Sequence, residues 1–188
     1  MNNLQIINNS FKYCFDKATT FYSAVKTSDI DKEASNLITK TIPRELDTYL
    51  SNNDYIVNGS IGKGLATKSP WIAILDKKVT KSTQKGVYIV FIFSSDYKHV
   101  YLALNQGTTI PGKFGSRLGK NDIAYNSKQI RNLLNISDTI LKTDGNANIA
   151  DDRYRAGSII HYGIRKTHKK EKKFSIFISV YIKNTRSC

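Results

Sequence analysis

The chain has few cysteines, few acidic residues and no long apolar run. Its 188 residues include two cysteines, Cys14 within an apolar helical pattern and Cys188 at the end. A disulfide framework is therefore not expected, and a reducing cytosol fits this composition. The first residues lack the charged and apolar regions of a signal peptide. No apolar run approaches the roughly twenty residues of a membrane helix. We therefore expect a cytoplasmic protein with no membrane partner.

The motifs of common catalytic and metal sites are incomplete. The segment Gly107–Phe114 matches a phosphate-binding loop except at its last position, where phenylalanine replaces the serine or threonine that would reach magnesium. No Ser-His-Asp or Cys-His arrangement is evident, and no metal-ligand spacing connects the three histidines, His99, His161 and His168. We expect no cofactor, no resident metal and no enzymatic activity.

One enzymatic alternative stays open, a metal-dependent nuclease. Asp76-Lys77-Lys78 ends an apolar run, and Asp96-Tyr97-Lys98 repeats the pattern in a turn. Such a nuclease needs two carboxylates that meet around magnesium, with a lysine that orients the attacking water. Asp54 is the only obvious upstream acid for Asp76.

The charge of the chain is strongly positive. Lysine and arginine number 29 against 15 acidic residues, which gives a net charge of +14. Residues 151–188 contain ten basic and three acidic residues, so they carry +7, half of the total. An excess of this size favours a polyanionic partner, nucleic acid above all.

Apolar periodicity predicts helices at the start of the chain. Residues 4–25 carry apolar side chains three, four and seven apart, which is typical of a helix packed on a core. A second helix is expected to start near Asp31. Pro43 fits the first turn of a third helix, Pro43–Leu50, rather than the interior of one long helix. A further helix is predicted at Asn121–Leu134.

Strands are predicted in the middle and at the end of the chain. A short strand, Tyr55–Val57, precedes the glycine-rich segment Asn58–Gly64. Apolar, β-branched and aromatic runs then predict strands at 69–76, 86–93, 100–105, 158–162 and 174–182. The short loop Ser94–His99 favours an antiparallel hairpin between two of them. We expect an α+β fold with a mostly antiparallel, curved sheet flanked by N-terminal helices, in a single domain over 1–188. Its helical part would be 1–52 and its sheet-rich core 55–182.

The series of runs from Ser69 to Thr109, which opens with Ser69-Pro70-Trp71, resembles the N-terminal DNA-recognition domain of the McrB family. That family belongs to modification-dependent restriction systems, and the resemblance covers roughly residues 55 to 182. It implies a module that grips double-stranded DNA and inspects a base without cutting. It also implies two partners, a GTP-hydrolysing motor domain or subunit and a separate nuclease subunit.

The resemblance assigns a base pocket to three residues. In such modules the modified base, 5-methylcytosine for example, swings out of the duplex, and apolar walls and a stacking ring offset the cost. Trp71 and Ile92 occupy the positions of pocket walls, and Tyr154 aligns with the tyrosine that stacks on the base. A tryptophan or isoleucine in an apolar strand is also an ordinary core residue. That interpretation therefore remains open for Trp71 and Ile92.

Basic residues around this centre are candidates for groove or phosphate contacts. Lys63 stands between two glycines where the family can place a wedge that enters the duplex, and a lysine cannot replace a lost base stack. Lys63 would instead bind a phosphate or reach into a groove. The remaining candidates are Lys68, Lys81, Lys85, Arg155, Arg165 and Lys166. Two other functions share this surface: recognition of an unmodified DNA site, and binding of RNA or a single strand by stacking.

Overall fold

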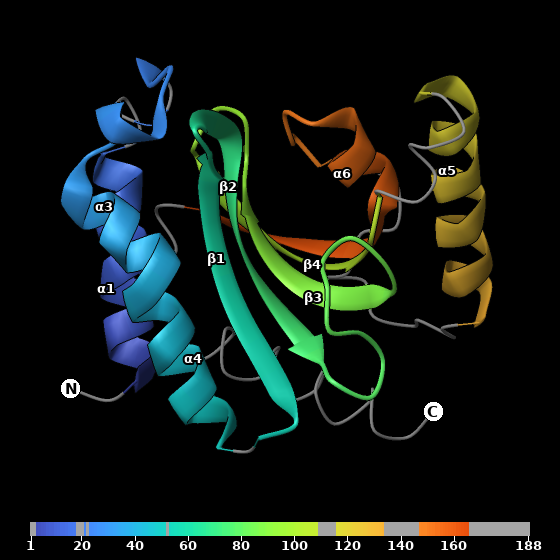
Figure 1. Ribbon diagram of the computed structural model, residues 1–188, viewed down its shortest axis with the longest axis horizontal. Helices are drawn as coiled ribbons and strands as arrows, with labels where there is room; N and C mark the ends of the chain where they lie inside the picture. Colours follow the sequence, from blue (N-terminus) through green and yellow to red (C-terminus); the bar gives the residue numbers. More distant parts are fainter. Residues whose placement is uncertain are drawn as a thin grey trace.

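A five-stranded antiparallel sheet forms the centre of the protein, and its strands are neighbours in chain order (Figure 1). The computed structural model describes residues 3–17, 21, 23–51, 53–108, 116–133 and 147–165. The strands are β1 (Tyr55–Lys63), β2 (Leu65–Asp76), β3 (Val87–Phe93), β4 (His99–Gln106) and β5 (Ser158–Arg165). On one side of the sheet lie the helices α1 (Asn3–Asp16), α3 (Lys32–Asn36) and α4 (Ile42–Leu50); on the other lie α5 (Ser116–Leu133) and α6 (Asp152–Gly157). The predicted α+β fold is confirmed.

The central strands are apolar on both faces because both faces are covered. Successive side chains of a strand point to opposite faces. Ile72 and its register partner Phe91 are buried in a cluster with residues of α1, α3 and α4. Ala73 and its partner Val90 belong to a second cluster, which Tyr154 of α6 joins. We call these two surfaces of the sheet the α1 face and the α6 face.

The first helix is shorter than its sequence pattern predicts. The apolar pattern extends to Val25, but α1 ends at Asp16. Lys26 instead forms an isolated antiparallel bridge with Leu65, and the Ala66 N–H donates to the Val25 carbonyl at 3.3 Å. The predicted helix over 4–25 is therefore confirmed as far as Asp16 and wrong at Ala24 and Val25, where the backbone is not helical and begins to pair with the sheet.

The predicted helix Pro43–Leu50 is confirmed as α4, but no gap separates it from the second predicted helix, because α3 and α4 belong to one continuous helical segment. The side chain of Asp31 caps the start by accepting from the Ala34 N–H at 3.0 Å. Between α3 and α4 runs a π-helical turn, η2 (Leu37–Thr41), in which the Ile42 N–H donates to the Leu37 carbonyl. Pro43 falls in the first turn of α4. The π-turn shifts the hydrogen-bond register and so accommodates a proline that cannot donate.

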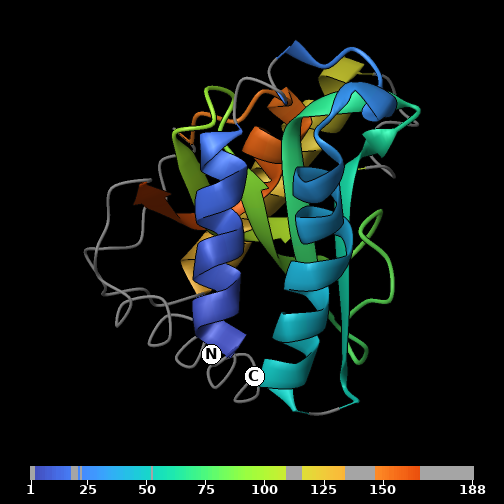
Figure 2. The same ribbon diagram turned by 90° about the vertical axis from the view of Figure 1, so that its left-hand side faces the viewer.

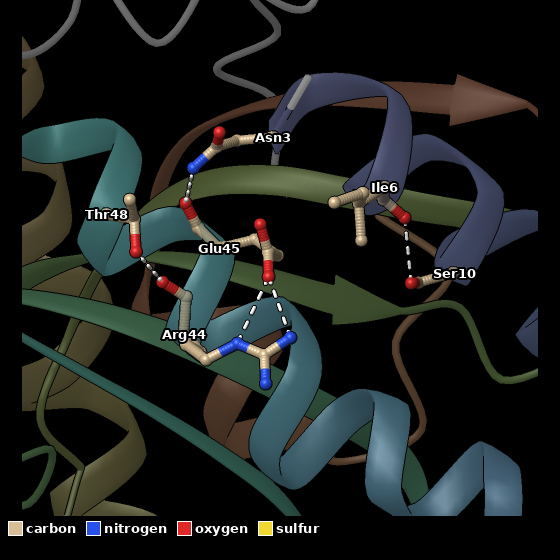
Figure 3. Close-up of polar contacts among 6 residues, drawn as sticks. All are labelled: Asn3, Ile6, Ser10, Arg44, Glu45 and Thr48. Atoms are coloured by element: carbon tan, nitrogen blue, oxygen red, sulfur yellow. Dashed lines mark hydrogen bonds and ion pairs between the residues drawn. The ribbon is translucent and has the colours of Figure 1, made fainter. Parts of the chain in front are cut away.

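The helical layer is held together by polar contacts as well as by its apolar core. Figure 2 shows α1 alongside the helical segment that ends in α4. The side-chain amide of Asn3 donates to the Glu45 carbonyl at 3.3 Å (Figure 3). The Glu45 carboxylate is largely buried and accepts from Arg44 Nε and Nη2 at 3.1 and 2.9 Å. This pairing satisfies a charge that would otherwise be costly to bury.

The glycine-rich segment Asn58–Gly64 lies in β1 and in the tight tip that joins it to β2. Gly62 and Gly64 have φ angles of 110° and 75°, in the left-handed region that favours glycine. A Cβ on Gly62 would stand 2.1 Å from the Leu65 carbonyl oxygen. At Gly59 a Cβ would meet the Ile38 carbonyl at 1.8 Å, so glycine lets the π-turn pack directly on the strand. The short predicted strand at Tyr55 is therefore the start of a longer one.

The other predicted elements are placed as follows. The hairpin between the runs at 86–93 and 100–105 is confirmed as β3 and β4. The predicted helix at 121–134 begins earlier, at Ser116, and the strand at 158 extends to Arg165. The strand expected at 174–182 lies outside the described residues. No described helix is both long enough and apolar enough to cross a membrane.

Candidate nucleic-acid interface

The three predicted pocket residues come together around one hollow on the α6 face. Trp71, Ile92 and Tyr154 line a cavity of about 250 Å³. They come from β2, β3 and α6. The remaining lining residues are Thr83, Gln84, Tyr88, Val90, Asn105 and Thr108. Aromatic and aliphatic groups therefore form the walls, and hydroxyl and amide groups supply the polar part.

The sheet register places Trp71 beside Ile92. The two residues are direct partners across β2 and β3, and Tyr101 of β4 pairs with Ile92 on its other side. Ile92 is 1% exposed, whereas Trp71 is half-buried. The next row along the same face consists of Ala73, Val90 and Ala103. Small alanine side chains there leave space that larger residues would fill.

A strap of residues 147–150 leads into α6 and anchors it across the sheet. The Ala150 N–H donates to Ser69 Oγ at 3.1 Å, and the Ser95 N–H donates to the Asn148 carbonyl at 2.8 Å. These contacts tie the strap to β2 and to the β3–β4 turn. Tyr154 follows in α6 and is half-buried. Tyr154 thus lines the pocket on the α6 face of the sheet, opposite the face that α1 covers.

The loop of residues 77–86 forms a second wall of the pocket. The Thr80 hydroxyl lies within hydrogen-bond distance of the Ser82 and Lys85 carbonyls, at 3.0 and 2.9 Å. The Tyr88 hydroxyl donates to the Thr83 carbonyl at 3.1 Å. Burial raises the pKa of Tyr88, so the phenol stays protonated and remains a donor. These contacts fix the loop that carries Gln84 beside the pocket.

Comparison with known families identifies the chain. A sequence model described as "MrcB-like, N-terminal domain" matches residues 18–175. The chain belongs to this MrcB-like family. The match begins well before residue 55, so it includes the α3–α4 segment as well as the sheet. No curated protein and no solved structure matches the chain.

The predicted basic contacts of this MrcB-like domain lie on the loop of residues 77–86, at the end of β1, within β2 and on α6. Lys81 and Lys85 are exposed on the loop of residues 77–86. Lys63 is exposed at the tip between β1 and β2, and Lys68 is exposed further along β2. Arg155 of α6 is exposed and pairs with Asp152. The side chain of Arg165 and all of Lys166 lie outside the described residues.

The tip between β1 and β2 carries an apolar pair that sequence reasoning missed. Leu65 is 69% exposed and Val25 is 70% exposed. Backbone hydrogen bonds join their two segments, since the Thr27 N–H donates to the Gly64 carbonyl at 3.2 Å. Backbone pairing of the two segments therefore places two exposed aliphatic side chains at the same end of the β1–β2 hairpin. The only sequence signal was a leucine directly after two turn glycines.

For the nuclease alternative, the structure places Asp54 next to Asp76, since Tyr55 is the register partner of Asp76 and the Lys77 N–H donates to the Asp54 carbonyl at 2.8 Å, but it does not bring the two Asp-x-Lys patterns together. Asp76 ends β2 near the start of β3, whereas Asp96 follows the end of β3, so the two patterns lie at opposite ends of that strand. The Asp76 carboxylate accepts from the Lys78 N–H at 2.8 Å, and that of Asp96 accepts from Ser94 Oγ at 2.6 Å. Within the described ranges no three histidine, cysteine or acidic side chains gather as metal ligands.

Proposed function

We propose that this MrcB-like domain binds double-stranded DNA as the specificity module of a restriction system and reads a modified cytosine flipped into the pocket. The observation that carries the proposal is the convergence of Trp71, Ile92 and Tyr154 on one cavity. Extrusion of a base costs a few kcal/mol, which stacking and apolar contact inside a pocket offset. The two aromatic residues supply faces for stacking, and Ile92 supplies an aliphatic wall.

The pocket walls would also favour a methylated base over an unmodified one. A buried methyl group contributes about 0.8 kcal/mol, which alone gives only a few-fold preference. Tight shape around the base must supply the rest. Gln84 and Thr108 line the same pocket with groups that both donate and accept hydrogen bonds. They are suited to the polar edge of a flipped base.

The exposed apolar pair at the tip between β1 and β2 could fill the gap left by a flipped base, which Lys63 could not. A base that leaves the duplex opens a gap, and proteins commonly fill such gaps with apolar wedges. Leu65 and Val25 provide exposed aliphatic groups next to Lys63. In this account Leu65 enters the stack while Lys63 binds a phosphate.

We also propose, from family membership, a GTP-hydrolysing motor and a nuclease subunit as partners, with no catalysis by the domain itself.

A second candidate is recognition of an unmodified DNA site by the same module. The specific observation in its favour is Lys63, a cation at the tip between the two turn glycines. A lysine there suits a groove or phosphate contact rather than insertion. In that case methylated and unmethylated duplexes would bind equally and in a salt-sensitive way.

Pocket variants test the proposal directly. Trp71→Ala and Tyr154→Ala should lose the preference for a duplex with 5-methylcytosine over its unmodified counterpart while they retain weak, salt-sensitive binding. Tyr125→Ala is the matched control, because Tyr125 is an aromatic residue of α5 that is 63% exposed and does not line the pocket. The measurement is fluorescence anisotropy with labelled duplexes. Unaltered preference in both pocket variants would show that the pocket is assigned wrongly.

A further inference from the structure

We propose that the buried amide pair Asn105–Gln106 at the end of β4 is a positioning element that docks α6 and thereby sets the Tyr154 ring against the pocket. We call this pair, together with Ser127 of α5, the amide clamp. The inference rests on the proposed function, because it explains how the stacking residue is held ready for a base. The structure ties the clamp to α6 by two separate routes.

The first route runs through Asn105. This residue is 2% exposed, and both ends of its amide are used. Its Oδ1 accepts from the Gln106 N–H at 2.8 Å, and its Nδ2 donates to the Tyr154 carbonyl at 3.3 Å. The donor is thus aimed at the backbone of the residue whose ring lines the pocket. Leaving a buried amide without its partner carries a desolvation cost, so this contact favours one placement of α6.

The second route runs through Gln106 and α5. The Gln106 Nε2 group donates to the Ile123 carbonyl and to Ser127 Oγ, each at 2.7 Å. The Ser127 hydroxyl is buried and donates in turn to the Ala156 carbonyl at 2.9 Å. Two carbonyls of α6, those of Tyr154 and Ala156, are therefore held by side chains from outside the helix. Figure 1 shows α5 beside α6, on the side of the sheet away from α1.

The local backbone is shaped to bring these groups together. The pairing of β4 with β5 shifts register between Leu104 and Asn105, and such irregularities re-aim a side chain. Gly157 ends α6, and a Cβ there would stand 2.5 Å from Asn105 Oδ1 and 3.2 Å from the Gln106 carbonyl. The glycine therefore permits the close approach on which both routes depend.

The length of α6 makes this docking decisive for Tyr154. The helix has 6 residues, and so short a helix has little stability of its own. Its position must come from contacts with the rest of the fold. Binding groups need to be held to within roughly 0.5 Å of their productive geometry, and the clamp supplies that constraint through hydrogen bonds from buried amides.

The test uses clamp variants that do not touch the pocket. Ser127 and Gly157 do not line the cavity, so Ser127→Ala and Gly157→Ala disturb α6 without removing a wall. Trp71 is the only tryptophan of the chain and lies in the pocket with Tyr154. Its emission therefore reports movement of the Tyr154 ring in the absence of DNA. Ile38→Val is the control, since Ile38 is fully buried in the cluster on the α1 face.

Both clamp variants should fold, shift the Trp71 emission and reduce the preference for methylated duplex by roughly fivefold to tenfold, as loss of about one hydrogen bond allows. Their affinity for unmodified duplex should keep the wild-type salt dependence. Ile38→Val should match their loss of stability in urea yet keep the wild-type emission and preference. If Gly157→Ala fails to fold, the result for Ser127→Ala alone tests the amide clamp.

Two results would overturn the clamp. One is wild-type emission and preference in the Ser127→Ala variant. The other is an equal loss of preference in Ile38→Val, which would reduce the effect to general destabilisation. If the wild-type protein itself shows no methyl preference, the proposed function fails; the Trp71 emission of the variants still decides whether the clamp sets the pocket.

Discussion

Ile92 serves the core and the proposed pocket at once, and its two roles can be separated. It is almost fully buried, and it lines the same cavity as Tyr154. Ile72, in the neighbouring strand, is equally buried but packs on the α1 face. Removal of one methyl from either residue should lower the free energy of unfolding by about 1 kcal/mol.

The two valine variants should therefore differ in binding and agree in stability. Ile92→Val loosens the wall against the base and should reduce the preference for methylated duplex about threefold, in line with roughly one lost methyl contact. Ile72→Val should retain the full preference. Urea unfolding and anisotropy titration check the two quantities. Equal preference in both variants would assign Ile92 to the core alone.

At the residue scale, sequence reasoning named three of the residues that line the proposed pocket. Trp71, Ile92 and Tyr154 came from resemblance to a family, since no local pattern distinguishes the first two from core residues. Tyr88 and Val90 were also within reach, because alternation along the strand puts them on the same face as Ile92. Asn105 and Thr108 could not be found this way. They line the pocket only because of the cross-strand register and the docking of α6, which the sequence does not reveal.

At the scale of elements, the tip between β1 and β2 is the part that we assign to the proposed wedge. The side chain of Leu65 is 69% exposed and therefore contributes little to the core. Leu65→Ala should therefore change the free energy of unfolding by less than about 0.5 kcal/mol. It should strongly reduce base flipping if the leucine fills the gap in the stack.

A fluorescent base analogue, 2-aminopurine, placed next to the methylated cytosine reports the flipping step by its loss of stacking. Val79→Ala is the matched control, because Val79 is 60% exposed in the turn after β2 and lies outside the pocket. We expect the flipping signal to fall in Leu65→Ala and to persist in Val79→Ala. A full signal in Leu65→Ala would remove the wedge from the account.

The elements that sequence patterns predicted correctly are those with strong local signals. The apolar runs of β2, β3 and β4 and the capping Asp31 each stand out in a short window. The continuous helical segment through Pro43 has no such local signal, because the π-turn that accommodates the proline depends on packing of Ile38 against Gly59. Likewise α6 is too short for a periodic signal, and its clamp lies at the end of β4, far away in sequence.

At the scale of the whole molecule, the net charge of +14 predicts that the proposed DNA binding is strongly salt-dependent. Each neutralised phosphate releases counterions, so affinity should fall with salt along a slope of about −0.9 per contact. Lys81 and Lys85 sit on the loop that forms a wall of the pocket. Replacing both by alanine should reduce the magnitude of this slope by about 2 and weaken methylated and unmodified duplexes alike.

A charge-matched control separates this effect from the loss of net charge. Lys32 and Lys40 are exposed on the helical segment that covers the α1 face. The double variant Lys32→Ala, Lys40→Ala should keep the wild-type slope, because those lysines lie away from the pocket. If both double variants lower the slope equally, the proposed orientation of the DNA on the α6 face is wrong.

The central claim, that the α6-face pocket reads a modified base in duplex DNA, is tested most directly by one titration of the unaltered protein. Matched duplexes with and without 5-methylcytosine would be compared by anisotropy across a salt series and without magnesium. The account predicts tighter binding of the methylated duplex at every salt concentration, with parallel slopes for the two duplexes. Equal affinity for both would contradict it and would leave a DNA-binding domain whose specificity lies in unmodified sequence.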